Sequence, residues 1–193
     1  MDVGLLIALQ SLRVDVLTQL MALLCALGDG GLVWVVLALV MLVFAEKRPA
    51  AIALLLSVLA CWLLVSCLLV DVFDRTRPCD ASIGVTAVMG VSRAGSSFPS
   101  FHAACGGAAV AIVWLMRSPA SSVPVMLLAL AIMFARMFCG VDYPSDILAG
   151  AVLGIVIGVV LSLPLNGLAA RPRAASRHSG RRTSVGGGKH SRY

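Results

Sequence analysis

Residues 50–70, AAIALLLSVLACWLLVSCLLV, form an unbroken apolar stretch without a charged side chain. A transmembrane helix needs about 20 such residues, because the hydrocarbon core is about 30 Å thick and each helical residue advances about 1.5 Å. Four further apolar stretches lie at residues 30–45, 101–116, 120–138 and 147–165. The fold that this pattern predicts is an all-α, polytopic transmembrane helix bundle.

The first 27 residues are less regular, because Arg13 and Asp15 interrupt the apolar residues. A charged side chain near the centre of a bilayer costs about 2.5 to 3.5 kcal/mol on the insertion scale, which disfavours a full span. We therefore expect a short span or an interfacial helix over residues 1–27. Together with the other stretches this gives five to six spans in one transmembrane domain over residues 1–165.

The composition excludes a soluble domain. Hydrophobic residues make up 60% of the chain and charged residues 12%, with a mean hydropathy of +1.01, whereas soluble domains are about half apolar. The six cysteines are scattered without the spacing of a zinc site, so we expect no metal and no cofactor. Whether Cys79 and Cys139, which the topology puts on one side, form a disulfide is left open.

The basic residues between the spans predict the orientation, since cytoplasmic loops retain positive charge. Lys47, Arg48, Arg117 and the basic residues of the C-terminal segment all fall on one side, which is predicted to be cytoplasmic. Residues 166–193 are poor in apolar side chains and rich in Gly, Ser and Arg, which predicts a disordered basic cytoplasmic tail. Membrane lipids are the expected partners. Nucleic acid is not expected, because the basic residues are not accompanied by an aromatic and basic binding face.

Three polar clusters then lie at the outer ends of spans. Their sequences are DRTRP at 74–78, SSFPSFHA at 96–103 and ARMFCGVDYPSD at 135–146. Ionisable groups at membrane boundaries are costly, so their gathering at one face predicts a functional site there. A helix bundle brings the three clusters together.

The residue types in these clusters suit a phosphate ester. Arg77 and Arg136 present planar donor forks that match phosphate oxygens. Ser100 and the amides around Phe101 open a helix, where unpaired N–H groups favour an anion. His102, in the first turn of that helix, can give a proton to a leaving oxygen near neutral pH.

Two carboxylates complete the predicted site. Asp142 and Asp146 are four residues apart and fall on one face of the turn that begins the last span. One of them can orient or activate a partner. The expected ligand is a phosphate ester at the outer face of the membrane.

In this order, the RP, FPSxH and YPSD motifs resemble the type-2 phosphatidic acid phosphatase superfamily of membrane phosphatases. The resemblance covers residues from about 28 to 158, and FPSFHA and GVDYPSDILAG are its most specific strings. It implies removal of phosphate from lipid phosphates and pyrophosphates, without metal, through a phosphohistidine. Small bacterial members often act on undecaprenyl pyrophosphate, which implies an inner-membrane protein with an outward-facing site.

The resemblance also implies residue roles. It makes Arg77 and Arg136 phosphate-binding residues and His102 the general acid. Ser100 and the next amide, that of Phe101, form the oxyanion cradle. Asp146 orients the nucleophile.

Three positions depart from the family pattern. The nucleophilic histidine of the family falls on Asp142, its first-motif lysine on Val70, and its glycine after the motif serine on Phe101. Arg75 is the candidate for the charge that the lysine supplies, as a further phosphate-binding residue. Asp142 is either the phosphoryl acceptor or one of a carboxylate pair that shares a proton and leaves the site able only to bind phosphate.

Two main functions stay open at this stage. The first is a hydrolase of lipid phosphates or pyrophosphates, of the undecaprenyl pyrophosphate or phosphatidic acid type. The alternative is a non-catalytic binder or transporter of a lipid phosphate. A phosphotransferase and a structural membrane partner are further alternatives. The sequence does not identify the lipid. It also leaves the oligomeric state open, because the stripe of Gly150, Gly154 and Gly158 can pack within one bundle or between copies.

Overall fold

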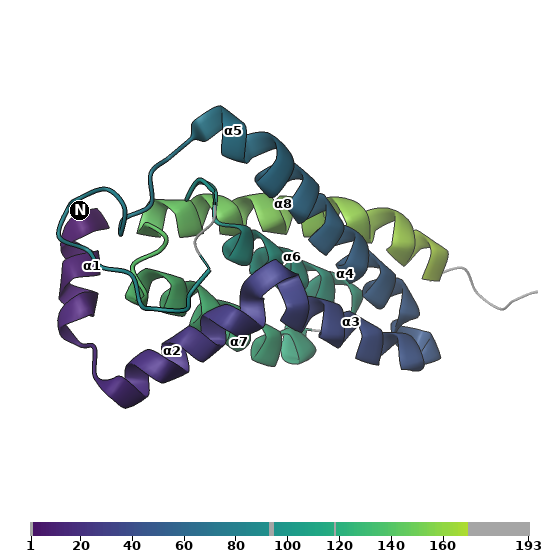
Figure 1. The fold of residues 1–193 in the computed structure, drawn as a ribbon. Helices are drawn as coiled ribbons and strands as arrows, with labels where there is room; N and C mark the ends of the chain where they lie inside the picture. The colour runs from purple at the N-terminus through teal and green to yellow at the C-terminus, as the bar shows by residue number, and fades with distance from the viewer. Residues whose placement is uncertain (1, 93–94, 118, 170–193) are drawn as a thin grey trace, which may run out of the picture.

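The computed structural model of the chain describes residues 2–92, 95–117 and 119–169, and these contain helices and loops but no strand. Figure 1 shows the helices, most of them running along one common direction. Their bounds are α1 Asp2–Ser11, α2 Asp15–Gly28, α3 Leu32–Val43, α4 Arg48–Cys61, α5 Val70–Phe73, α6 Phe101–Met116, α7 Pro119–Phe138 and α8 Pro144–Ala169. Short 3-10 turns lie at Asp29–Gly31 and Ala45–Lys47, and a π-helix at Trp62–Leu69 joins α4 to α5. The predicted all-α transmembrane bundle is confirmed.

Four helical segments of the described chain are long and apolar enough to cross a membrane: Asp15–Val43, Ala45–Leu69, Pro119–Phe138 and Pro144–Leu165. The apolar helix α6, with 16 residues, is shorter. Residues 1–27, for which a short span or an interfacial helix was expected, contain α1 and most of α2. The chain forms the separate helix α1, and α2 then joins α3 across the turn at Asp29–Gly31. In Figure 1, α1 runs across the direction of the bundle, as an interfacial helix would.

Small residues let α6 and α8 approach each other closely. Gly150, Gly154 and Gly158 of α8 pack against the backbone of α6. A Cβ atom at Gly154 would collide with the carbonyl oxygen of Ala104. In this structure the glycine stripe therefore packs within the chain, as one of the two alternatives expected.

The helix α6 lies inside the bundle and is buried from His102 to Ala109. Its first residues lie well below the start of α8, because a Cβ atom at Gly150 would meet the carbonyl oxygen of Ser100. The segment between α5 and α6 therefore enters the bundle before α6 begins. This places the FPSFHA motif below the end of the bundle at which α8 begins.

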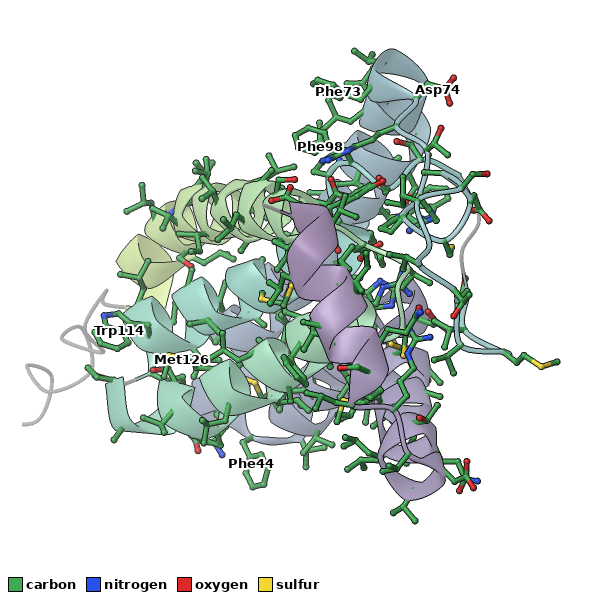
Figure 2. All side chains as sticks on the ribbon, turned by 90° about the vertical axis from the view of Figure 1, so that its left-hand side faces the viewer. Phe44, Phe73, Asp74, Phe98, Trp114 and Met126 are labelled. Carbon is green, nitrogen blue, oxygen red and sulfur yellow. The ribbon has the colours of Figure 1, made fainter. Side chains whose placement is uncertain are left out.

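Large apolar side chains cover the outside of the bundle. Phe44, Trp114 and Met126 point away from it in Figure 2, and Trp114 is 52% exposed. The buried core is instead rich in alanine. Large exposed apolar groups around a core of small residues suit a protein surrounded by lipid.

The C-terminal boundary differs slightly from the expected one. The helix α8 continues to Ala169, four residues past the predicted end of the transmembrane domain at 165. The rest of the predicted basic tail lies outside the described residues.

Substitution of Gly154 by alanine is expected to destabilise the protein. The added methyl group collides with backbone rather than with a flexible side chain, and overpacking of this kind costs about 1 to 3 kcal/mol. Gly4→Ala is the matched control, because a Cβ atom there has nothing within 4 Å. Thermal unfolding in detergent should show a lower midpoint for Gly154→Ala and an unchanged midpoint for Gly4→Ala. Equal midpoints would contradict the close packing of α6 and α8.

Candidate functional site

A cavity of about 360 Å³ opens where the three polar clusters meet. The loop after α5 contributes Arg77, and the loop before α6 contributes Ser100. The helix α7 contributes Arg136 close to its end, and the turn between α7 and α8 contributes Asp142. The bundle thus brings together the three clusters, as predicted.

The carboxylate of Asp142 lies at the centre of the charged groups. Its Oδ1 accepts hydrogen bonds from Arg77 Nη1 at 2.6 Å and from Arg136 Nη2 at 3.1 Å. Its Oδ2 accepts from Arg136 Nε at 3.0 Å and from the hydroxyl of Ser100 at 2.8 Å. The residues predicted to bind phosphate therefore converge on one anion, and that anion belongs to the protein.

Backbone carbonyls hold the two arginines in addition to the carboxylate. Arg77 donates to the carbonyl oxygens of Val141 at 2.9 Å and Ser96 at 3.0 Å. Arg136 Nη1 donates to the carbonyl oxygen of Ser92 at 3.0 Å. These contacts fix the guanidinium groups from several sides. The positions of the donors thus do not rest on the Asp142 carboxylate alone.

Asp142 is ionised at neutral pH. Only 1% of its surface is exposed, and burial alone would raise the pKa of its carboxyl group. The charges of Arg136 and Arg77, with the hydrogen bonds from Arg136, outweigh burial and lower the pKa below its usual value. The protein thus contains a buried carboxylate that is charged and paired with two arginines.

The second carboxylate has its own partner. Asp146 forms an ion pair with Arg75, and its Oδ2 accepts the backbone N–H of Tyr143 at 2.9 Å. Arg75 also donates to the hydroxyl of Ser145 at 2.9 Å, and its guanidinium lies 4.1 Å from the ring centre of Tyr143. The structure therefore pairs each aspartate with arginine, and not the two aspartates with each other.

His102 lies in the same cavity as Asp142 and faces an aspartate that the sequence analysis did not single out. Its Nε2 is 3.0 Å from Oδ1 of Asp29, in the turn between α2 and α3. His102 is 8% exposed, whereas the side chain of Asp29 is 37% exposed. The available signal was an aspartate followed by two glycines inside an apolar segment, DGG at 29–31.

The structure thus separates the predicted site residues into two groups. Around the cavity it places Arg77, Ser100, Phe101, His102, Arg136 and Asp142. Arg75 and Asp146 form a neighbouring pair that does not line the cavity. Among the described residues no disulfide joins Cys79 to Cys139, and the sulfur of Cys139 lies 3.8 Å from that of Cys25.

The fold and the cavity together define an integral membrane protein in which arginine and serine donors surround a buried carboxylate, and a histidine lines the same cavity. The model of the PAP2 superfamily matches residues 50–166, which is more than half of the chain, and the chain belongs to this superfamily. Asp29 lies outside the matched residues.

Two solved structures share the fold. The crystal structure of LpxE from Aquifex aeolicus has a TM-score of 0.65 and 23% identity, and the match covers 83% of this chain and 93% of LpxE. A transmembrane PAP2-type phosphatidylglycerolphosphate phosphatase from Bacillus subtilis has a TM-score of 0.65 and 22% identity, with 83% and 82% covered. No curated protein matches the chain.

Removal of the Asp142 carboxylate is expected to destabilise the protein strongly. In Asp142→Ala, Arg77 and Arg136 stay buried without their shared anion, and breaking a buried ion pair costs about 3 to 5 kcal/mol. Glu46→Ala removes an exposed carboxylate at the other end of the bundle and serves as control. Chemical unfolding at neutral pH measures the free energy of unfolding of native protein and of both variants.

The same comparison has a defined pH dependence. A lowered pKa in the folded state gives stability that is present above the unfolded value of about 3.9. It is lost as the pH falls through the lower folded value. Native protein and Asp142→Ala should therefore differ at pH 7 and approach each other in acid. A difference that stays constant with pH would contradict an ionised Asp142.

Proposed function

We propose that this protein hydrolyses the phosphoric ester or anhydride bond of a lipid phosphate or pyrophosphate. Undecaprenyl pyrophosphate and phosphatidic acid are the substrate types. The proposed site faces outward from the cytoplasmic membrane of a bacterium. The arrangement of basic residues supports this orientation, with Lys47, Arg48 and Arg117 at the end of the bundle away from the cavity.

One observation carries the proposal. The donors of Arg77, Arg136 and Ser100 already converge on a single buried anion, at distances of 2.6 to 3.1 Å. Guanidinium groups bind carboxylate and phosphate oxygens in the same bidentate geometry. A phosphoryl group placed where the Asp142 carboxylate lies would therefore meet donors that are already in position. It would also lie in the cavity that His102 lines.

The remaining cavity wall suits a lipid substrate. Trp62, Val65 and Phe101 line the cavity together with the polar residues. Apolar groups beside a cluster of positive charge match an amphiphile with an anionic head group. This supports a phosphorylated lipid over a small soluble phosphate.

In the proposed reaction an oxygen attacks the terminal phosphorus, and the bond from this phosphorus to the leaving oxygen breaks. The leaving oxygen is the ester oxygen of a lipid monophosphate or the bridging oxygen of a lipid pyrophosphate. His102 gives a proton to that leaving oxygen. Arg77, Arg136 and Ser100 stabilise the charge on the phosphoryl oxygens. Positioning and charge stabilisation supply most of the catalysis in reactions of this kind.

The attacking atom is either an Asp142 oxygen or a water oxygen. Attack by Asp142 forms an aspartyl phosphate, whose phosphorus–oxygen bond water then cleaves to release phosphate. Attack by water gives phosphate directly. In both cases the Asp142 carboxylate must first separate from Arg77 and Arg136. Because the pKa of Asp142 is lowered, this carboxylate is charged when the incoming phosphoryl group displaces it.

The position of Asp142 also favours a second candidate function. A carboxylate with four hydrogen bonds is a weak nucleophile, and it competes with phosphate for the same donors. The second candidate is therefore a non-catalytic protein that binds or moves a lipid phosphate. Arg75 and Asp146 would then support the site by fixing the turn at Tyr143.

Phosphate release by purified protein in detergent tests the proposal. The substrates are undecaprenyl pyrophosphate and phosphatidic acid, and the variants are His102→Ala and Asp142→His. We expect release by the native chain and a loss of about a hundredfold or more in His102→Ala, since general acid catalysis contributes about 10² to 10⁴. Trp114→Phe, at the far end of α6, is the control that should keep full activity.

The outcomes separate the two candidates. Release by the native chain that is abolished in His102→Ala supports a phosphatase. No release by the native chain, with activity in Asp142→His, supports a binder whose cradle remains competent. Equal release by the native chain and His102→Ala would contradict the assigned general acid.

A further inference from the structure

Asp29 is placed by a break in a membrane-spanning segment. The helix α2 ends at Gly28, and the turn Asp29–Gly31 follows before α3 begins. Gly30 and Gly31 have φ values of 60° and 74°, a conformation that L side chains adopt only with strain. The two glycines allow the chain to turn at this point without unwinding either helix. The carboxylate of Asp29 thereby reaches the cavity.

The turn packs directly against α6. A Cβ atom at Gly28 would lie 2.6 Å from Cδ2 of His102 and 3.3 Å from its Nε2. A Cβ atom at Gly31 would lie 3.6 Å from the sulfur of Cys105, one helical turn further along α6. The backbone at Gly28 therefore lies against the edge of the imidazole. The ring is held on one side by packing and at Nε2 by the Asp29 carboxylate, 3.0 Å away.

A purely structural role explains Asp29 poorly. It is the only charged residue between Asp15 and Glu46, inside a segment apolar enough to span the membrane. Charged groups within such segments are costly and most often mark functional sites. Its carboxylate contacts His102, the only histidine of the described residues, and both side chains line the cavity of the anion site.

We propose that Asp29 is a positioning residue for His102 in the reaction. This assignment rests on the proposed phosphatase function and adds a residue from outside the region that matches the family model. Asp29 accepts the Nε2–H of His102, which fixes the orientation of the ring. A carboxylate partner also favours the protonated imidazole. Asp29 itself touches no reacting atom.

The proton balance depends on this contact. Protonated His102 carries a proton on each ring nitrogen, and the Nε2 proton stays in the hydrogen bond to Asp29. The Nδ1 proton passes to the lipid oxygen as its bond to phosphorus breaks. His102 is then neutral and takes up a proton from water after the products leave. Asp29 remains a carboxylate throughout.

The test compares two leaving groups. A lipid alcohol needs a proton in order to leave, whereas p-nitrophenolate leaves readily without one. Phosphatidic acid and p-nitrophenyl phosphate are therefore given to native protein, Asp29→Asn, Asp29→Glu, His102→Gln and the Asp29→Asn/His102→Gln double variant. Asp15→Asn, an exposed position on the same membrane-spanning segment, is the matched control.

We expect Asp29→Asn to lower kcat on phosphatidic acid by about tenfold to a hundredfold, part of the general acid contribution, with KM unchanged. The loss on p-nitrophenyl phosphate should be several times smaller. The double variant should lose no more than His102→Gln alone, because both changes disable one unit. Asp29→Glu, which keeps a carboxylate, should recover part of the loss, and Asp15→Asn should show none.

Two outcomes would overturn the assignment while the phosphatase function stands. One is native activity that Asp29→Asn leaves unchanged. The other is a loss in Asp29→Asn that is equal on both substrates, together with a double variant whose loss is the product of the two single losses. A general structural defect would give this result. If the native chain releases phosphate from neither of these substrates nor from undecaprenyl pyrophosphate, the proposed function itself fails, and the assignment fails with it. If Asp29→Asn does not fold, the Asp29→Glu variant is measured on both substrates instead. A larger loss on phosphatidic acid than on p-nitrophenyl phosphate supports the assignment, and an equal loss overturns it.

Discussion

The ion pairs of the Asp142 carboxylate with Arg77 and Arg136 connect the parts of the chain that form the site. Arg77 follows α5, Arg136 belongs to α7, and Asp142 lies in the turn before α8. Two positive charges in a buried place are costly unless an anion compensates them. The protein supplies that anion itself, as the side-chain carboxylate of Asp142. The cavity, the loop before α6 and the start of α8 are therefore held around one carboxylate.

For the proposed function, the same contact has two opposite consequences for the binding of a phosphoryl group. Its donors are fixed in advance, which favours binding without reorganisation. Its charge is already balanced, so that an incoming anion must replace another. The close approach of α6 to Gly150 and Gly154 of α8 sets the position of α6, whose first turn carries His102, within the bundle. A phosphatase then breaks a phosphorus–oxygen bond of the bound lipid, whereas a binder releases the lipid unchanged.

The sequence predicted the fold well, because long apolar stretches have few alternatives to transmembrane helices. It did not specify the connection near the N-terminus, where the Asp29–Gly31 turn joins α2 and α3 into one segment. Convergence of Arg77, Ser100, His102 and Arg136 was predictable from motifs at span ends. The partner of each side chain was not: Asp29 meets His102 across 73 positions, and Arg75 turns to Asp146. Such contacts depend on helix packing and side-chain direction, which spacing along the chain does not specify.

The central claim is that Arg77 and Arg136 form a phosphate site that Asp142 occupies. Titration of native protein, Asp142→Asn and Asp142→Asn/Arg136→Gln with inorganic phosphate by calorimetry tests it most directly. We predict that Asp142→Asn binds phosphate at least about tenfold more tightly than native protein, a gain of about 1.4 kcal/mol. The added Arg136→Gln change should abolish that gain. Equal affinities in native protein and Asp142→Asn would contradict the claim.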